Sequence, residues 1–90
     1  MKIEFDPAKR EATLEHRGLD MARAAEIFAE ATLTVAEDRK DYGERRFISI
    51  GRLDGRMVVS VWTPRGAARR IISLRKANDR EQALYGDRLD

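Results

Sequence analysis

His16 is the residue of this chain whose type best suits acid–base chemistry. It is the sole histidine among 90 residues, and histidine is the side chain that exchanges protons near neutral pH. A helix is expected over Pro7–Arg17, where Lys9, Thr13 and His16 have the i, i+4, i+7 spacing of one helix face. This face would place a proton-transfer group beside a cation, as general acid–base catalysis at a charged substrate requires. The alternative is a surface histidine near a helix C-terminus, where its positive charge suits the helix dipole.

The charge of the chain is divided unevenly between its two halves. Residues 1–44 hold 7 Lys and Arg against 11 Asp and Glu, for a net charge of −4, whereas residues 45–90 hold 11 against 5, for a net charge of +6. Ten of those eleven cations are arginines, whose planar guanidinium matches phosphate and stays charged at any working pH. The C-terminal half therefore indicates a polyanionic partner, with an ordinary solvated basic surface as the alternative.

Four cations bracket a pair of isoleucines in the segment from Arg69 to Lys76. Regular strand alternation would place Arg69 and Arg75 on one face and Arg70 on the other, unless a bulge intervenes. Arg75 and Lys76 end the strand just before a capped helix. Because helix N-termini attract phosphate, they are the favoured anion site. The alternative is a set of rim charges that salt screens.

Further polar candidates lie on either side of this segment. Glu44 could act as a base or pair with an arginine, and pairing is favoured because exposed carboxylates are weak bases at neutral pH. Tyr85, four residues after Glu81, could donate a hydrogen bond to phosphate or simply pack its ring. Arg46 and Arg65 are expected to add phosphate contacts.

Two aromatic residues and an acidic cluster are more ambiguous. Tyr42 and Trp62 could stack on nucleic-acid bases, although a tryptophan in an apolar strand is expected in the core. Glu37, Asp38 and Asp41 form the one conceivable magnesium site, and a solvated charged loop is the favoured interpretation. We therefore expect no metal and no cofactor.

Composition excludes several classes of protein. The chain has no cysteine, which excludes disulfides, iron–sulfur clusters and thiol nucleophiles, and one histidine cannot build a site of several imidazoles. No apolar run reaches the roughly 18 residues of a membrane helix, and the N-terminus does not resemble a signal peptide. The expectation is a single cytoplasmic domain over residues 1–90.

Capping residues mark the ends of the expected helices. Asp6 and Pro7 begin the first helix and Gly18 ends it. Asp20 can cap a second helix, whose apolar stripe comprises Met21, Ala24, Ala25 and Phe28. Asn78 and Glu81 have the spacing of a capping box for a last helix that runs through Tyr85.

Short apolar and β-branched runs predict the strands, and turn residues separate them. The predicted strands are Lys2–Phe5, Thr32–Val35, Phe47–Ile50, Met57–Trp62 and Arg69–Leu74, with a charged loop over Glu37–Glu44 and turns at Leu53-Asp54-Gly55 and Pro64-Arg65-Gly66. The order β-α-α-β-β-β-β-α predicts an α+β domain with a mostly antiparallel sheet. A helix-turn-helix DNA reader is disfavoured, because Glu26 and Glu30 on the second helix would repel phosphate.

Four blocks of sequence resemble the BrnT toxins of type II toxin–antitoxin systems. The resemblance covers residues 2–85, and the blocks follow the order of that family. They are Phe5-Asp6-Pro7-Ala8-Lys9-Arg10-Glu11-Ala12, Asp41-Tyr42-Gly43-Glu44-Arg45-Arg46-Phe47-Ile48 followed by Gly51, Val61-Trp62-Thr63-Pro64-Arg65-Gly66, and Arg70-Ile71-Ile72-Ser73-Leu74-Arg75-Lys76-Ala77 with Glu81 and Tyr85. The resemblance implies a RelE-like ribonuclease fold and inhibition of translation through RNA cleavage. It also implies a ribbon-helix-helix antitoxin of the BrnA kind, in a heterotetramer that binds operator DNA through the antitoxin.

For this chain, the resemblance makes RNA the expected polyanion. Metal-free cleavage needs a base for the ribose 2′-hydroxyl, cations for the five-coordinate phosphate and an acid for the 5′-oxygen. The candidate catalytic residues are His16, Lys9, Arg75, Glu44 and Tyr85, and the candidate RNA-binding residues are Arg46, Arg65, Arg69, Arg70 and Lys76. His16 and Arg17 stand where the family usually has lysine and histidine. A degenerate toxin that binds antitoxin or RNA without cleavage is therefore the alternative.

Overall fold

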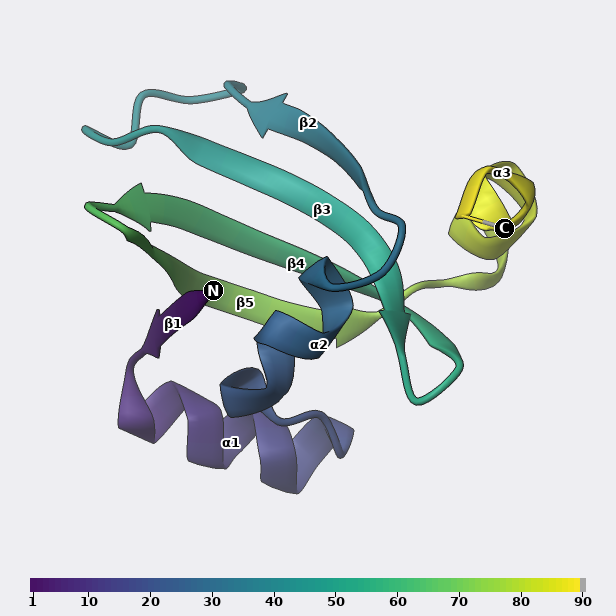
Figure 1. Cartoon of the computed structure of the whole chain (residues 1–90), viewed down its shortest axis with the longest axis horizontal. Coiled ribbons are helices and arrows are strands. Elements are labelled where there is room, and N and C mark those ends of the chain that lie inside the picture. Colours follow the sequence, from purple (N-terminus) through teal and green to yellow (C-terminus); the bar gives the residue numbers. More distant parts are fainter. Residues whose placement is uncertain (90) are drawn as a thin grey trace.

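A computed structural model describes residues 1–89 and shows one five-stranded sheet with helices beside it (Figure 1). Its elements are β1 (Lys2–Phe5), α1 (Pro7–Arg17), the 3₁₀ helix η1 (Met21–Arg23), α2 (Ala24–Phe28), β2 (Leu33–Glu37), β3 (Arg46–Leu53), β4 (Arg56–Arg65), β5 (Ala68–Lys76) and α3 (Asp79–Leu89). Along the sheet the strands follow the order β1-β5-β4-β3-β2, and only the β1–β5 pair is parallel. The predicted α+β class and mostly antiparallel sheet are confirmed. No helix within residues 1–89 is long and apolar enough to span a membrane.

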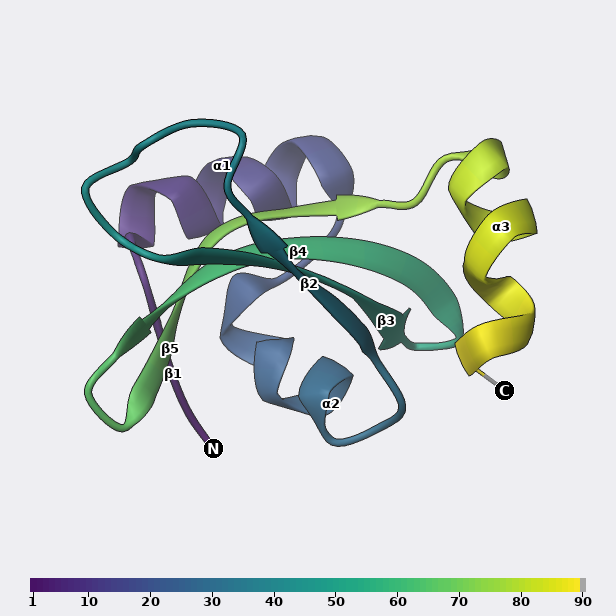
Figure 2. The same cartoon turned by 90° about the horizontal axis from the view of Figure 1, so that it is seen from above.

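The sheet has two faces with different coverings. The helix face carries Val58, Trp62, Ile71 and Leu74, which pack with four buried residues of the loop after α1, of η1 and of α2: Leu19, Met21, Ala24 and Ile27. The open face carries Ile48, Ile50 and Val59, and α3 contributes Tyr85 and Leu89 at one end of it. Figure 2 shows the strands passing between α1 and α2, with α3 beyond the end of the sheet.

A β-bulge in β5 decides which side chains reach the open face. Val61 lies opposite Ser73, but the next residue, Trp62, lies opposite Ile71, so Ile72 is the extra residue of the bulge. Register partners share a face. Arg75 lies opposite Val59, on the open face.

The same register shows on which face of the sheet the two remaining arginines of β5 lie. Arg70 lies opposite Thr63 and so shares the open face with Arg75, whereas Arg69, opposite Pro64, lies on the helix face. The prediction of regular alternation, with Arg69 and Arg75 together and Arg70 apart, is therefore wrong. The bulge reverses the alternation between residues 70 and 75.

The capping residues behave as predicted. Asp6 accepts a hydrogen bond from Ala8 N, and Gly18 ends α1 with φ 68° while its N–H bonds to Leu14 O. Asn78 Oδ1 accepts from Glu81 N at 2.8 Å, and Asn78 N donates to the Glu81 carboxylate at 2.9 Å. These local bonds satisfy backbone groups at the helix ends, which is why short sequence patterns located them.

The stripe predicted for the second helix is only partly correct. Its first turn is the 3₁₀ helix η1, which has about three residues per turn. The fully buried residues are consequently Met21, Ala24 and Ile27, at steps of three, while Ala25 and Phe28 are only partly buried.

All strands except the first differ from their predicted bounds. β3, β4 and β5 continue through polar residues, because pairing with neighbours extends the ladder beyond the apolar runs. Pro64 and Arg65 belong to the end of β4 rather than to a turn, and the chain reverses at Gly66, where φ is 56°. The Asp54-Gly55 turn is confirmed, with φ of 53° and 78°.

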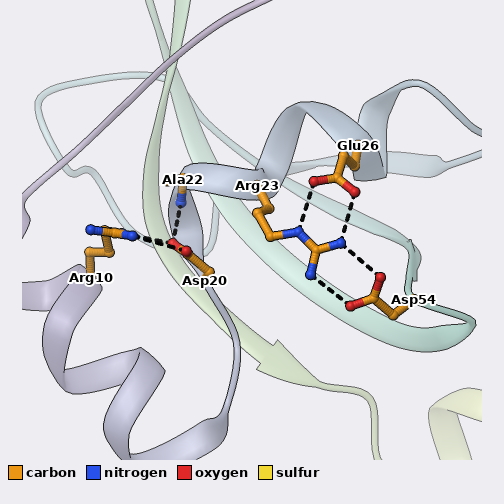
Figure 3. A network of polar contacts seen from close by, with 6 residues as sticks. All are labelled: Arg10, Asp20, Ala22, Arg23, Glu26 and Asp54. Carbon is orange, nitrogen blue, oxygen red and sulfur yellow. Dashed lines mark hydrogen bonds and ion pairs between the residues drawn. The ribbon is translucent and has the colours of Figure 1, made fainter.

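Ion pairs attach the N-terminal helices to each other and to the sheet (Figure 3). Asp20 caps η1 through Ala22 N and accepts from Arg10 of α1 at 2.7 and 3.0 Å. Arg23 donates to Glu26 and reaches Asp54 in the β3–β4 hairpin, each through two nitrogens. The hydrogen bond from Arg10 lowers the pKa of Asp20 below its usual 3.8.

Replacing Asp20 by asparagine should lower the free energy of unfolding by about 0.5–1 kcal/mol at pH 7, because asparagine keeps the cap but loses the Arg10 ion pair. Asp20 has a depressed pKa in the folded state, so its contribution is present above about pH 4 and is lost as pH falls further. Urea denaturation of both proteins between pH 7 and pH 2.5 should show their difference shrinking with acid. A difference that grows toward low pH would contradict this assignment.

Candidate functional site

A hollow lies on the open face, between β2 and α3. It encloses about 730 Å³ over a floor of strand residues that includes Ile48, Val59 and Val61, and Arg75 and Tyr85 stand in its wall. Its other lining residues are Val35, Ala36, Glu37, Asp38, Arg39, Ile50, Asn78, Arg80, Glu81 and Leu84. Three arginines and three acidic residues line it, so its formal charges cancel.

Arg75 is held in this hollow by Glu81. Two guanidinium nitrogens of Arg75 donate to the two carboxylate oxygens of Glu81 at 2.8 and 2.9 Å. This hydrogen bonding lowers the pKa of Glu81 from its usual 4.5 to about 2. The Glu81 carboxylate also accepts from Asn78 N and so occupies the N-terminus of α3. An anion site formed by Arg75 with that helix end was predicted, and the chain's own carboxylate fills it.

A second, smaller groove runs between α1 and β5. It encloses about 420 Å³ and is lined by Lys9, Ala12, Thr13, His16, Arg17, Met21, Ile72 and Ser73. The predicted face of α1 is thus brought against the bulge of β5. All titratable side chains that line the groove are basic, which makes it the more favourable of the two hollows for a phosphate.

Arg17 fixes α1 against β5. β1 pairs with β5 only from Ala68 to Ile71, which leaves the rest of that strand edge to α1. Arg17 Nη1 donates to Leu74 O at 2.9 Å on this edge. Arg17 therefore anchors the helix that carries His16.

The groove and the hollow adjoin along the β4–β5 pair. Ser73 lines the groove, Val61 lines the hollow, and the two residues are register partners on the open face. Arg75 follows Ser73 by two residues on the same face, a Cα separation of about 7 Å. The basic groove of α1 and the guanidinium of Arg75 are therefore neighbours on one surface.

Other predicted phosphate contacts do not converge there. Arg69 lies on the helix face, where its guanidinium stacks 4.1 Å from the Trp62 ring centroid and 4.5 Å from that of Phe28. Lys76 shares the helix face with its partner Val58. Arg65 is exposed at the end of β4.

Arg70 is a second predicted cation of β5 that reaches the open face. It lies opposite Thr63 of β4 and, on its other side, beside Glu4 of β1. It does not line the hollow that contains Arg75. Arg70 can therefore extend the cationic surface beyond the hollow.

Glu44, Arg46 and Tyr42 form a separate cluster at the start of β3. Arg46 Nε donates to Glu44 Oε2 at 3.0 Å, and the guanidinium lies 4.0 Å from the Tyr42 ring centroid. The cluster lines a pocket of about 230 Å³ that contains neither His16 nor Arg75. Glu44 is thus an ion-pair partner here, the second of the two roles considered for it.

Trp62 and the acidic segment have structural contacts of their own. Trp62 is 7% exposed, stacks on Phe47 at 4.9 Å and donates from Nε1 to Ser49 Oγ at 2.8 Å, as a core residue should. Glu37 accepts two hydrogen bonds from Arg39, and these lower the pKa of its carboxyl.

Comparison with protein families identifies the chain. Residues 5–81 match the model of the family described as "Ribonuclease toxin, BrnT, of type II toxin-antitoxin system". The chain belongs to the BrnT family. It is therefore a ribonuclease toxin of a type II toxin–antitoxin system, and its partner is a protein antitoxin. No curated protein matches the chain.

Two residues of the candidate site, Glu81 and Ser73, were not among the predicted site residues of this BrnT chain. Glu81 was recognised as a helix cap, but its second role, as the partner of Arg75, depends on the packing of α3 against β5. Ser73 joins the groove to the hollow because Ile72 is bulged. The capping-box spacing was a usable signal for Glu81, whereas no local signal marked the bulge.

Proposed function

We propose that this chain cleaves RNA without a metal ion where the groove meets the hollow, on a RelE-like fold, and thereby inhibits translation in the cytoplasm. The observation that carries the proposal is the bulge at Ile72. It places Arg70 and Arg75 on the open face and brings Ser73 of that face into the groove of Lys9 and His16. An RNA strand laid across β5 would meet cations on both sides of the strand.

The chemistry is an attack of the ribose 2′-oxygen on phosphorus. The O2′–P bond forms and the P–O5′ bond breaks, which leaves a 2′,3′-cyclic phosphate and a 5′-hydroxyl. His16 takes the proton of the 2′-hydroxyl, and Tyr85 protonates the departing 5′-oxygen. Lys9 and Arg75 stabilise the charge that develops on the five-coordinate phosphate. Glu44 has no part in this scheme, because its carboxylate pairs with Arg46 in a different pocket.

A toxin that binds without cleavage is the second candidate. It is favoured by the contact of Arg17, whose guanidinium is bound to Leu74 O and so serves the structure. With Arg17 bound in this way, Lys9 is the cation left beside His16 in the groove. The two candidates differ in whether purified protein cuts RNA.

For the partner, we propose a ribbon-helix-helix antitoxin of the BrnA kind, in a heterotetramer that contacts operator DNA through the antitoxin. The family membership supports a protein antitoxin. The toxin itself is poorly suited to read DNA, since α2 has five residues and the neighbouring Arg23 is bound by Glu26 and Asp54. Size measurement of the co-purified complex tests the stoichiometry.

The nuclease proposal is tested by incubating purified protein with RNA in excess EDTA. Wild-type protein should produce fragments that end in 2′,3′-cyclic phosphate, and the double variant His16→Ala, Arg75→Ala should be slower by at least about 10³-fold. Arg56→Ala, which removes one charge at the exposed β3–β4 hairpin, is the matched control and should cleave normally. Intact RNA despite tight binding would favour the binding module.

A further inference from the structure

Glu81 lies where the end of β5 meets the start of α3. Its carboxylate receives both arms of the Arg75 guanidinium and the N–H of Asn78, all within 2.9 Å. Its own N–H donates to Asn78 Oδ1. The Glu81 side chain thus caps the N-terminus of α3 and also forms an ion pair with Arg75 on the open face.

The orientation of the Arg75 guanidinium depends on this ion pair with Glu81. The Arg75 side chain is 43% exposed, whereas the Glu81 side chain is only 20% exposed. Besides Glu81, the guanidinium also donates to Lys76 O, at 3.4 Å, which is longer than either bond to Glu81. Arginine has several rotatable bonds, and a bidentate carboxylate fixes both the position and the plane of its guanidinium. Glu81 is the less exposed partner and is also bound to Asn78 N, so it determines where the guanidinium points.

The ion pair persists across the pH range in which the protein would act. The carboxyl of Glu81 has a pKa of about 2 because Arg75 and Asn78 donate to it, so it stays ionised throughout. The pairing also has a cost for RNA binding, because Glu81 offsets part of the charge that Arg75 offers to phosphate. A contact that weakens electrostatic attraction but fixes geometry suits a group that must be oriented before the reaction.

We propose that Glu81 is a positioning residue, which holds the Arg75 guanidinium in a fixed orientation on the open face for the scissile phosphate. It acts through Arg75 and does not touch the RNA. This inference rests on the proposed nuclease, in which Arg75 stabilises the phosphate. It also makes α3 part of the active site's support, since the helix carries the residue that orients the cation.

The test compares Glu81→Gln with a matched variant of the same helix, Gln82→Ala. Glutamine at position 81 keeps an oxygen for Asn78 N but loses the ion pair, whereas Gln82→Ala removes the hydrogen bond from Gln82 Nε2 to Ala77 O and leaves Arg75 paired. Glu81→Gln should lower kcat about 10-fold. This variant should bind RNA as tightly as wild type or a few-fold more tightly, because the net charge rises by one. Gln82→Ala should lower Tm by about 4 °C, with kcat within twofold of wild type.

A double-mutant cycle and an NMR measurement complete the test. In an Arg75→Ala background, Glu81→Gln should have no further effect on kcat. The Arg75 Nη–H resonances should exchange slowly with solvent in wild type and Gln82→Ala, and rapidly in Glu81→Gln. Equal kcat losses in Glu81→Gln and Gln82→Ala, an additive cycle, or unchanged exchange of the Arg75 Nη–H protons would each overturn the inference. If wild-type protein fails to cut RNA, the nuclease proposal and the inference that depends on it fall together, whereas a Glu81 failure in an active enzyme leaves the nuclease intact.

Discussion

Replacement of Arg75 by alanine is expected to lower kcat for RNA cleavage by about 10²–10³-fold, the cost of removing one group that stabilises transition-state charge. The guanidinium lies on the open face beside the groove of His16 and is already oriented by Glu81. Single-turnover cleavage of a labelled RNA by folded variant and wild type measures the effect. Arg75→Lys should recover only part of the activity, because an ammonium lacks the planar fork.

Arg69→Ala provides the matched control within the same strand. Arg69 lies on the helix face and stacks on Trp62 and Phe28. Its removal should lower the free energy of unfolding by about 1 kcal/mol, since a cation–π contact and packing are lost, and should leave kcat within about threefold. Equal losses of activity at positions 69 and 75 would contradict the face assignment that the bulge at Ile72 creates.

Replacement of Trp62 by alanine is expected to have the largest effect on stability, a loss of about 3–5 kcal/mol. The indole joins Phe47, Phe28 and Arg69 over the helix face, and its N–H bonds to Ser49. A domain of this length has a total free energy of unfolding of about 5–13 kcal/mol. The variant should therefore be marginally folded, as chemical denaturation followed by circular dichroism would show.

Trp62→Phe separates packing from hydrogen bonding at the same position. Phenylalanine retains the ring contacts but leaves Ser49 Oγ without the indole donor, so a loss of about 1–2 kcal/mol is expected. If Trp62→Ala instead left stability unchanged while RNA binding fell, the indole would be a base-stacking residue rather than part of the core.

The bulge shows why strand periodicity located the arginines of β5 but assigned their faces wrongly. Ile71 and Leu74 are both buried in the helix-face core, although they are three residues apart. A regular strand cannot bury both, so one residue must be extra. The pairing with β4 identifies that residue as Ile72. The apolar pattern of Ile71, Ile72 and Leu74 alone is compatible with more than one choice.

The sequence by itself determined the features that depend on neighbours along the chain. Asp6, Gly18 and the Asn78–Glu81 pair marked helix ends, and Asp54-Gly55 marked a hairpin, because caps and tight turns use bonds between residues a few positions apart. The sequence was also sufficient to indicate the BrnT family, which the match over residues 5–81 confirmed.

Only the tertiary structure decided which of the charged residues work together. The face of each β5 arginine follows from its register with β4, and the Arg75–Glu81 pair follows from the packing of α3 against the end of the sheet. The same packing separated Glu44 from His16, although both had been considered for proton transfer. Register and docking are set by the fit of whole surfaces, and no local pattern of residue types records them.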